Sequence, residues 1–124
     1  MSFDWNEFQV LAEELRRRED EAAKRTAISR IYYAIYWRAR NLLESEGFVY
    51  RQDGKSHQQV WQEYKQRGRT HNAIRRFGIF LRDNRTQADY IADVEDVSGL
   101  TEDSFELAEK IIYYLQQIEK KTQN

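Results

Sequence analysis

The chain contains no cysteine and no proline, and it has only five glycines and two histidines among its 124 residues. Without cysteine there is no disulfide, no thiolate metal ligand and no catalytic thiol. With only His57 and His71 available, a zinc site is not expected, and no other metal or cofactor is predicted. The absence of proline and the scarcity of glycine leave long helices with few internal breaks.

Long hydrophobic runs are also missing. The mean hydropathy is −0.92, and no apolar run reaches the roughly 18 residues that a membrane span requires. We therefore expect no membrane-spanning segment and no membrane partner. The first residues show no basic leader before an apolar stretch, so no signal peptide is expected. Together with the lack of cysteine, this predicts a cytoplasmic protein.

The composition is typical of one globular domain covering residues 1–124. Hydrophobic residues make up 40% of the chain, aromatic residues 14% and charged residues 33%, which excludes a disordered chain. The formal net charge is −1, so the protein is not expected to coat nucleic acid through overall charge. Any anion-binding surface must therefore come from the local arrangement of charges.

Charge is distributed unevenly along the chain. Residues 65–85 contain seven basic residues and one acidic residue, a net charge of +6. Residues 86–110 contain eight acidic residues and one basic residue, a net charge of −7. Either the two segments pair within the protein, or the basic segment is free to bind an anionic partner. The sequence leaves both interpretations open.

Apolar residues recur at helical spacing, and alternating strand patterns are absent. Caps and glycines predict helices over about 4–18, 20–46, 56–66, 70–84 and 101–120, with Asp4, Ser56, Thr70 and Thr101 at their starts. Residues 88–98 are expected to form a helical turn followed by a loop. The predicted fold is an all-α up-and-down bundle of about five helices, four long or medium and one short.

A basic stripe is predicted on the fourth of these helices. Its members follow one another at steps of four and three residues, which places them on one helix face: His71, Arg75, Gly78, Arg82 and Arg85. Arginines stacked in this way repel one another and favour an anionic partner such as phosphate. Gly78 leaves the middle of the stripe without a side chain, either for the approach of a ligand or for packing against another helix.

Two further clusters contain residue types that carry chemistry. Tyr33, Tyr36 and Arg40 share a face of the second predicted helix, which suits a wet groove, a subunit interface or plain core. Arg51 and His57 are separated by five residues. An arginine beside a histidine can in principle cleave RNA without metal, because histidine transfers the proton and arginine stabilises the phosphate charge.

Residues 29–36, Ser-Arg-Ile-Tyr-Tyr-Ala-Ile-Tyr, are followed by Ala39, Leu42-Leu43 and Gly47. This pattern resembles the signature helix of the HEPN domains (higher eukaryotes and prokaryotes nucleotide-binding). Lys55-Ser56-His57 resembles the family's Lys-Thr-His step. Residues 85–90, Arg-Thr-Gln-Ala-Asp-Tyr, resemble its Arg-x-x-Ala-Asp-Tyr segment. The resemblance covers about residues 20–120.

This resemblance implies a helical protomer that forms a homodimer. Such proteins commonly occur in prokaryotic two-gene, toxin–antitoxin-like modules with a minimal nucleotidyltransferase as partner. Many are metal-independent RNases that use an Arg-x(4–6)-His motif in a cleft between two protomers. Here Arg85 matches the motif's arginine, but Tyr90 stands where the histidine is expected, and tyrosine with a reference pKa of about 10 is a poor proton shuttle near neutral pH.

We therefore expect a dimeric HEPN-like module that binds RNA, a nucleotide or an acidic partner and has a degraded catalytic motif. The candidate catalytic residues are Arg85, Tyr90, His57 and Arg51, and the candidate phosphate contacts are His71, Arg75, Arg82 and Arg85. One alternative is a metal-independent endoribonuclease that uses His57 or His71 with Arg51 or Arg85. Another is a protein-interaction scaffold whose tyrosine-rich helix serves only the dimer.

Overall fold

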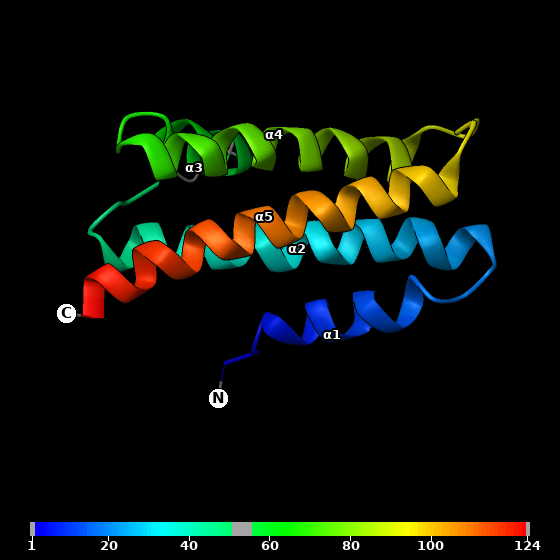
Figure 1. The fold of residues 1–124 in the computed structure, drawn as a ribbon, viewed down its shortest axis with the longest axis horizontal. Coiled ribbons are helices and arrows are strands. Elements are labelled where there is room, and N and C mark those ends of the chain that lie inside the picture. Colours follow the sequence, from blue (N-terminus) through cyan, green and yellow to red (C-terminus); the bar gives the residue numbers. More distant parts are fainter. Residues whose placement is uncertain (1, 51–55, 124) are drawn as a thin grey trace.

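Five α-helices make up the described part of the protein, which in this computed structural model comprises residues 2–50 and 56–123 (Figure 1). The helices are α1 (Asn6–Leu15), α2 (Glu21–Ser45), α3 (Ser56–Tyr64), α4 (Arg69–Tyr90) and α5 (Val97–Gln123). No strand occurs within these two ranges, so the predicted all-α helical bundle is confirmed. None of the helices in the described ranges is long and apolar enough to cross a membrane.

The helix α2 is the centre of the bundle. It packs against each of the other four helices. Figure 1 shows α2 and α5 running side by side in the same direction, with α1 and α4 antiparallel to them. The short helix α3 packs against α4 and α2. The chain therefore passes up and down through the bundle and brings α3 and α4 together over one side of α2.

The ends of α2 agree with its sequence signals. The side chain of Asp20 accepts a hydrogen bond from the backbone N–H of Ala23 at 3.2 Å, which caps the start of the helix. After its last turn comes Gly47 with a φ of +94°, a conformation that favours glycine because a Cβ would be strained there. The predicted span of 20–46 is confirmed to within one residue at each end.

The apolar core lies where α2, α4 and α5 meet. Its larger aliphatic and aromatic members include Ile31, Ile35 and Leu43 of α2, Ile74 and Leu81 of α4, and Phe105, Ile111 and Leu115 of α5. Burial of each such side chain stabilises the fold by about 1.5–3 kcal/mol. This packing fixes the rotation of α4 about its own axis. As a result, the side of α4 that carries Gly78 and Arg85 faces α3 and α2.

Some helix ends differ from the prediction. The helix α4 begins at Arg69 after Gly68, whose φ is +126°, so Thr70 is not its cap. At its other end α4 continues to Tyr90, about six residues further than predicted, and α5 begins four residues earlier than predicted. The helix α1 ends three residues early, at Leu15. The turn and loop expected over 88–98 are therefore reduced to residues 91–96.

A side chain from α2 explains the extension of α4. The guanidinium of Arg25 donates hydrogen bonds to the carbonyl oxygens of Ala88 at 3.0 Å, Ile91 at 2.7 Å and Ala92 at 2.9 Å. The last carbonyls of a helix lack partners within the helix and need them from elsewhere. Because this partner comes from a distant part of the chain, the local sequence around residue 90 does not reveal it.

Candidate anion-binding site

His57, the second residue of α3, lies against tyrosines of α2. Its Nδ1 is 2.7 Å from the hydroxyl oxygen of Tyr32. Its ring stacks on Tyr36 at a centroid distance of 4.1 Å and meets Tyr33 edge to face at 5.7 Å. These contacts hold the imidazole in one orientation, and they exist only because α3 folds back onto α2.

The hydrogen bonds of Tyr32 determine which nitrogen of His57 carries the proton. Trp61 donates from Nε1 to the Tyr32 oxygen at 3.1 Å, and the acceptor that the structure provides for the tyrosine hydroxyl is His57 Nδ1. Tyr32 therefore donates to Nδ1, and neutral His57 keeps its proton on Nε2. The opposite tautomer leaves a buried hydroxyl hydrogen without an acceptor, which costs about 1–3 kcal/mol.

The environment of His57 keeps it neutral. Burial, reinforced by the positive charges of Arg85, Arg82 and Arg40, lowers its pKa from 6.5 to about 4. Burial also raises the pKa of Tyr32, so the hydroxyl keeps its hydrogen. At neutral pH His57 can therefore donate a hydrogen bond from Nε2, but it holds no imidazolium proton to transfer.

Arg85 of α4 lies against two of the same tyrosines. Its Cζ lies 5.3 Å from the ring centre of Tyr32 and 5.6 Å from that of Tyr33. The side chain is 12% exposed, and its buried Nε has no hydrogen-bond partner. An unsatisfied buried donor costs about 1–3 kcal/mol, so the guanidinium favours an acceptor brought by a ligand.

Asp89 stands beside Arg85 one turn further along α4. Its Oδ2 is 3.7 Å from Arg85 Nη1, which is too long for a hydrogen bond. Ser29 of α2 donates to the same oxygen at 3.2 Å, and Arg30 donates from Nη2 to the Ser29 hydroxyl at 3.3 Å. The carboxylate therefore lies where an anion would approach Arg85, without satisfying the guanidinium itself.

Arg82 supplies a second positive charge. It lies one turn before Arg85 and contributes to the lowered pKa of His57. It makes no ion pair with any residue in the described ranges. We call the group formed by Tyr32, His57, Arg82, Arg85 and Asp89 the His57–Arg85 site. It combines two guanidinium groups and a neutral N–H donor around one buried tyrosine, which is a donor set suited to a phosphate.

Gly78 is a packing position. A Cβ at this residue would lie 2.5–2.8 Å from three ring carbons of Trp61, which is closer than real contacts allow. Trp61 of α3 therefore covers the middle of the basic stripe. Of the two interpretations of Gly78, packing against another helix is correct and an opening for a ligand is wrong, because the missing side chain makes room for the indole ring.

His71 lies far from the His57–Arg85 site. It precedes Arg85 by 14 residues, which corresponds to about 21 Å along the axis of α4. Its Nε2 is 3.7 Å from Glu46 Oε1, and its ring packs at 5.5 Å from that of Tyr64. Burial lowers the pKa of His71, and the nearby Glu46 carboxylate opposes this change. The predicted four-residue phosphate stripe is therefore divided between the two ends of α4.

Arg75 and Tyr90 are the other predicted site residues on α4. The Nε of Arg75 is buried and has no hydrogen-bond partner, although Trp61 separates this part of α4 from Arg82. Tyr90, the last residue of α4, is 73% exposed, and its ring centre lies 6.0 Å from Arg85 Cζ. Tyr90 thus borders the site as an exposed aromatic surface. Arg51, the predicted partner of His57, lies outside the described residues.

The tyrosine face of α2 is mostly interior. Tyr36 is 2% exposed and belongs to the core, whereas Tyr33 is half-buried beside His57. Arg40 donates from Nη1 to the Tyr36 hydroxyl at 3.1 Å, and its Cζ lies 3.6 Å from the ring centre of Tyr50. Tyr33 and Tyr36 pack against the His57 ring, and Arg40 bonds Tyr36. These three residues, predicted to suit a wet groove, a subunit interface or plain core, thus support His57 from the α2 side.

Sequence reasoning missed the roles of three residues. Tyr32 and Trp61 look like ordinary core positions in the sequence. Trp61 bonds Tyr32 and Tyr32 bonds His57, and both bonds join α3 to α2, so the sequence does not reveal them. Asp89 follows Arg85 by four residues, which is a recognisable pair on a helix. The predicted helix ended near residue 84, and that early end hid the pair.

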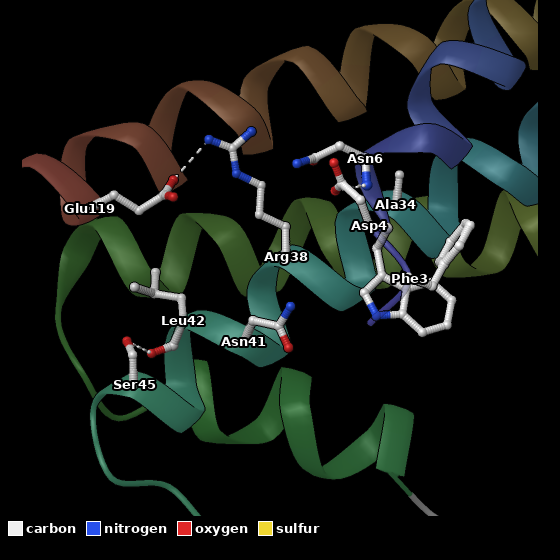
Figure 2. Close-up of a pocket in the computed structure, with 10 residues that line it drawn as sticks. Phe3, Asp4, Asn6, Ala34, Arg38, Asn41, Leu42, Ser45 and Glu119 are labelled. Atoms are coloured by element: carbon white, nitrogen blue, oxygen red, sulfur yellow. Dashed lines mark hydrogen bonds and ion pairs between the residues drawn. The ribbon is translucent and has the colours of Figure 1, made fainter. Parts of the chain in front are cut away.

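The larger cavities open elsewhere on the molecule. One of about 490 Å³ lies between the N-terminal segment, α2 and α5, where Arg38 turns toward Glu119 at 2.9 Å (Figure 2). Another of about 500 Å³ lies beside His71 at the start of α4. Neither is lined by His57 or Arg85. Within residues 2–50 and 56–123 no three His, Asp or Glu side chains gather closely enough to hold a metal ion.

Comparisons with known proteins assign no family to the chain. No protein-family model matches it, and no curated protein and no solved structure matches it either. The interpretation of the site therefore depends on its own geometry and on the segments that resemble HEPN domains.

Proposed function

We propose that this protein is a HEPN-type helical module that binds RNA through its phosphates at the His57–Arg85 site and does not cleave it efficiently. The observation that carries the proposal is the buried, unpartnered Nε of Arg85 beside a neutral His57 whose proton is on Nε2. Both groups are hydrogen-bond donors, and Arg82 adds positive charge. Phosphate oxygens are the acceptors that such donors bind most strongly.

The surroundings of Arg85 favour RNA over a small anion or an acidic protein. Tyr90 presents an exposed ring next to the guanidinium. Unpaired bases stack on exposed aromatic rings, at about 1–3 kcal/mol per base, while arginines hold the adjoining phosphates. A free nucleotide could use the same pair of contacts, whereas an acidic protein surface would leave the ring without a partner.

The proposal includes an assembly. The protein would act as a homodimer, in the cytoplasm, within a prokaryotic two-gene module whose other product is a minimal nucleotidyltransferase. The resemblance of residues 29–36 and 85–90 to HEPN segments supports this assembly. A second protomer would bring a second His57–Arg85 site, so that one RNA could contact both.

A metal-independent ribonuclease is the second candidate. One observation favours it: His57 and Arg85 both contact Tyr32, although they are 28 residues apart. To act as a base through Nε2, His57 must adopt the opposite tautomer, at a cost of about 1–3 kcal/mol. This cost lowers the fraction of molecules that hold the reactive tautomer roughly 5- to 150-fold. The lowered pKa also makes His57 a weaker base.

A single binding experiment tests the proposal. The full-length protein is titrated into a labelled stem–loop RNA with single-stranded flanks at low salt, with and without EDTA, and anisotropy and RNA integrity are measured in the same samples. We expect binding that weakens steeply with salt and RNA that stays intact. Arg82→Gln and Arg85→Gln should each weaken binding about tenfold. Arg76→Gln removes the same charge from the exposed, opposite side of α4 and should leave affinity nearly unchanged.

The other functions predict different results. Cleavage that survives EDTA and is lost in His57→Ala would establish the ribonuclease instead. If a mononucleotide bound as tightly as RNA, the ligand of this site would be a nucleotide and not RNA. The absence of RNA binding at low salt would contradict the proposal and favour the protein-interaction scaffold. Thermal unfolding of each variant shows whether a loss of binding reflects a loss of fold.

A further inference from the structure

The outer side of α4 and α5 carries acidic groups that the rest of the protein does not neutralise. Asp83, Asp103, Glu106 and Glu109 are exposed, and none of them forms an ion pair with a residue in the described ranges. The arginines Arg82 and Arg85 lie on the other side of α4, near α2 and α3. Asp83, Asp103, Glu106 and Glu109 therefore present their charge on a different face from Arg82 and Arg85, and within the described residues the two segments pair at Arg85 and Asp89.

These acidic residues border two adjoining hollows, the first between α4 and α5 and the second on α5 alone. Two hollows of about 490 and 300 Å³ lie along α5, and they share Glu106 and Lys110 in their walls. The first is lined from α4 by positions 80, 83, 84 and 87, and from α5 by positions 103, 106, 107 and 110; the second continues to 113 and 114. Each helix thus contributes a stripe at steps of three and four residues. We call this feature the acidic furrow; positions 103–113 give it a length of about 15 Å.

Exposed aromatic side chains lie in the same furrow. Phe80 is 56% exposed and lines the first hollow, and Tyr113 is 57% exposed and lines the second. Single exposed aromatics are common on protein surfaces. Here two of them lie in adjoining hollows with acidic residues between them, so the surface offers apolar contacts and negative charge side by side.

We infer that the acidic furrow binds a basic amphipathic helix of a partner protein. Charge selects the occupant, because lysine and arginine side chains would meet Asp103 and Glu106, whereas RNA and acidic proteins are repelled. Shape selects a helix, because two packed helices with stripes at three- and four-residue steps form a groove that accepts the ridge of a third. Apolar residues on one face of the partner helix would contact Phe80 and Tyr113.

A second copy of this chain is a poorer occupant. The arginines of its α4 stripe are at least partly buried toward its own α2 and α3, so they are not available to an acidic furrow. Arg16, near the end of α1, already bonds Glu102 at 2.8 Å in its own chain. The inference does not depend on RNA binding, since the furrow shares no residue with the His57–Arg85 site.

The test uses the full-length protein and two synthetic helical peptides. Both peptides carry leucine at positions i, i+3, i+4 and i+7, and the remaining positions are lysine in one and glutamate in the other. Calorimetry should detect binding of the lysine peptide and none of the glutamate peptide. The double variant Asp103→Lys/Glu106→Lys should bind the lysine peptide at least tenfold more weakly. Phe80→Ala should weaken it about fivefold without changing RNA affinity.

A matched control separates the furrow from general charge attraction. Glu7→Lys/Glu14→Lys makes the same change in net charge at two exposed residues of α1 and should keep the wild-type peptide affinity. Equal losses in the two double variants would overturn the inference. A wild-type dimer that the Asp103→Lys/Glu106→Lys variant dissociates, measured by analytical ultracentrifugation, would also overturn it, because the occupant would then be a second copy.

Discussion

The two histidines of this protein are buried to similar degrees, but the charges next to them differ in sign. Burial lowers the pKa of both. Around His57 the neighbouring charges are arginines, which lower its pKa further, whereas Glu46 counteracts the effect of burial on His71. Both surroundings contain a carboxylate of the protein, Asp89 at 3.7 Å from Arg85 and Glu46 at 3.7 Å from His71, but only around His57 do arginines outnumber it. A neutral histidine therefore marks a candidate anion site where the positive charges around it outnumber the carboxylates.

The largest expected effect comes from removing the indole that holds α3 on the bundle. Trp61→Ala should lower the free energy of unfolding by about 3–5 kcal/mol, because it creates a cavity in the core and removes the donor to Tyr32. Urea denaturation followed by circular dichroism measures this loss. Trp61→Phe keeps most of the volume without the N–H and should cost less. Equal stability of the alanine variant and the wild type would show that α3 contributes little.

The second-largest expected effect is on the pH dependence of the free energy of unfolding, which distinguishes the two histidines. The folded-state pKa of His57, about 4, lies below its unfolded value near 6.5, so the unfolded chain binds more protons between these pH values. The stability that comes from keeping His57 neutral in the folded protein is fully present above about pH 6.5 and is lost as the pH falls toward 4. The loss should be about 1–2 kcal/mol after allowing for the partial exposure of the ring.

Urea denaturation at several pH values between 4 and 7 measures this slope. His57→Asn should flatten it substantially. His71→Asn is the matched variant, and it should flatten the slope less, because Glu46 offsets part of the effect of burial on the pKa of His71. An unchanged slope in His57→Asn would contradict the lowered pKa of His57.

The carboxylate beside Arg85 gives a smaller effect on binding. Asp89→Asn removes the negative charge that lies 3.7 Å from Arg85 Nη1, so RNA should bind about two- to fivefold more tightly. Asp83→Asn makes the same charge change on the same helix but on the furrow side and should alter affinity less. Weaker binding by Asp89→Asn would mean that Asp89 positions Arg85 for the ligand and does not compete with it.

The smallest effect concerns the carboxylate beside His71. Glu46→Gln should lower the pKa of His71 further, because the charge that opposes burial is removed. NMR titration of the two imidazoles measures both pKa values in one experiment, and the pKa of His57 should stay near its wild-type value. RNA affinity should not change. A decrease in RNA affinity would place the His71 end of α4 within the binding surface.

The fold could largely be predicted from local sequence signals, and the exceptions lie at helix ends. Asp20 and Gly47 define α2 because a cap and a positive φ act on their immediate neighbours. The end of α4 was predicted too early because its carbonyls are satisfied by Arg25, which lies more than 60 residues away in the chain. At α2 the local signals were thus interpreted correctly, whereas a long-range partner of α4 was missed and the caps predicted at Thr70 and Thr101 were wrong.

The site was predicted only as separate parts. The spacing of Arg82 and Arg85 placed them on one helix face, and His57 was named as a candidate in a different segment. Their common neighbour, Tyr32, looked like core, and His71 was grouped with the arginines because it shares their helical spacing. Helical spacing alone gives the face of a residue but neither its distance from a second helix nor what covers that face.

The sequence by itself determined that the chain is helical, where α2 begins and ends, and which residues share each helix face, because these follow from caps, glycines and a period of 3.6 residues. Only the tertiary structure decided that Trp61 fills the space at Gly78 and that His57 meets Arg85 at Tyr32. It also left Asp83, Asp103 and Glu106 on a different face from Arg82 and Arg85. These outcomes depend on how buried side chains of several helices pack together, and packing is a property of all the helices at once.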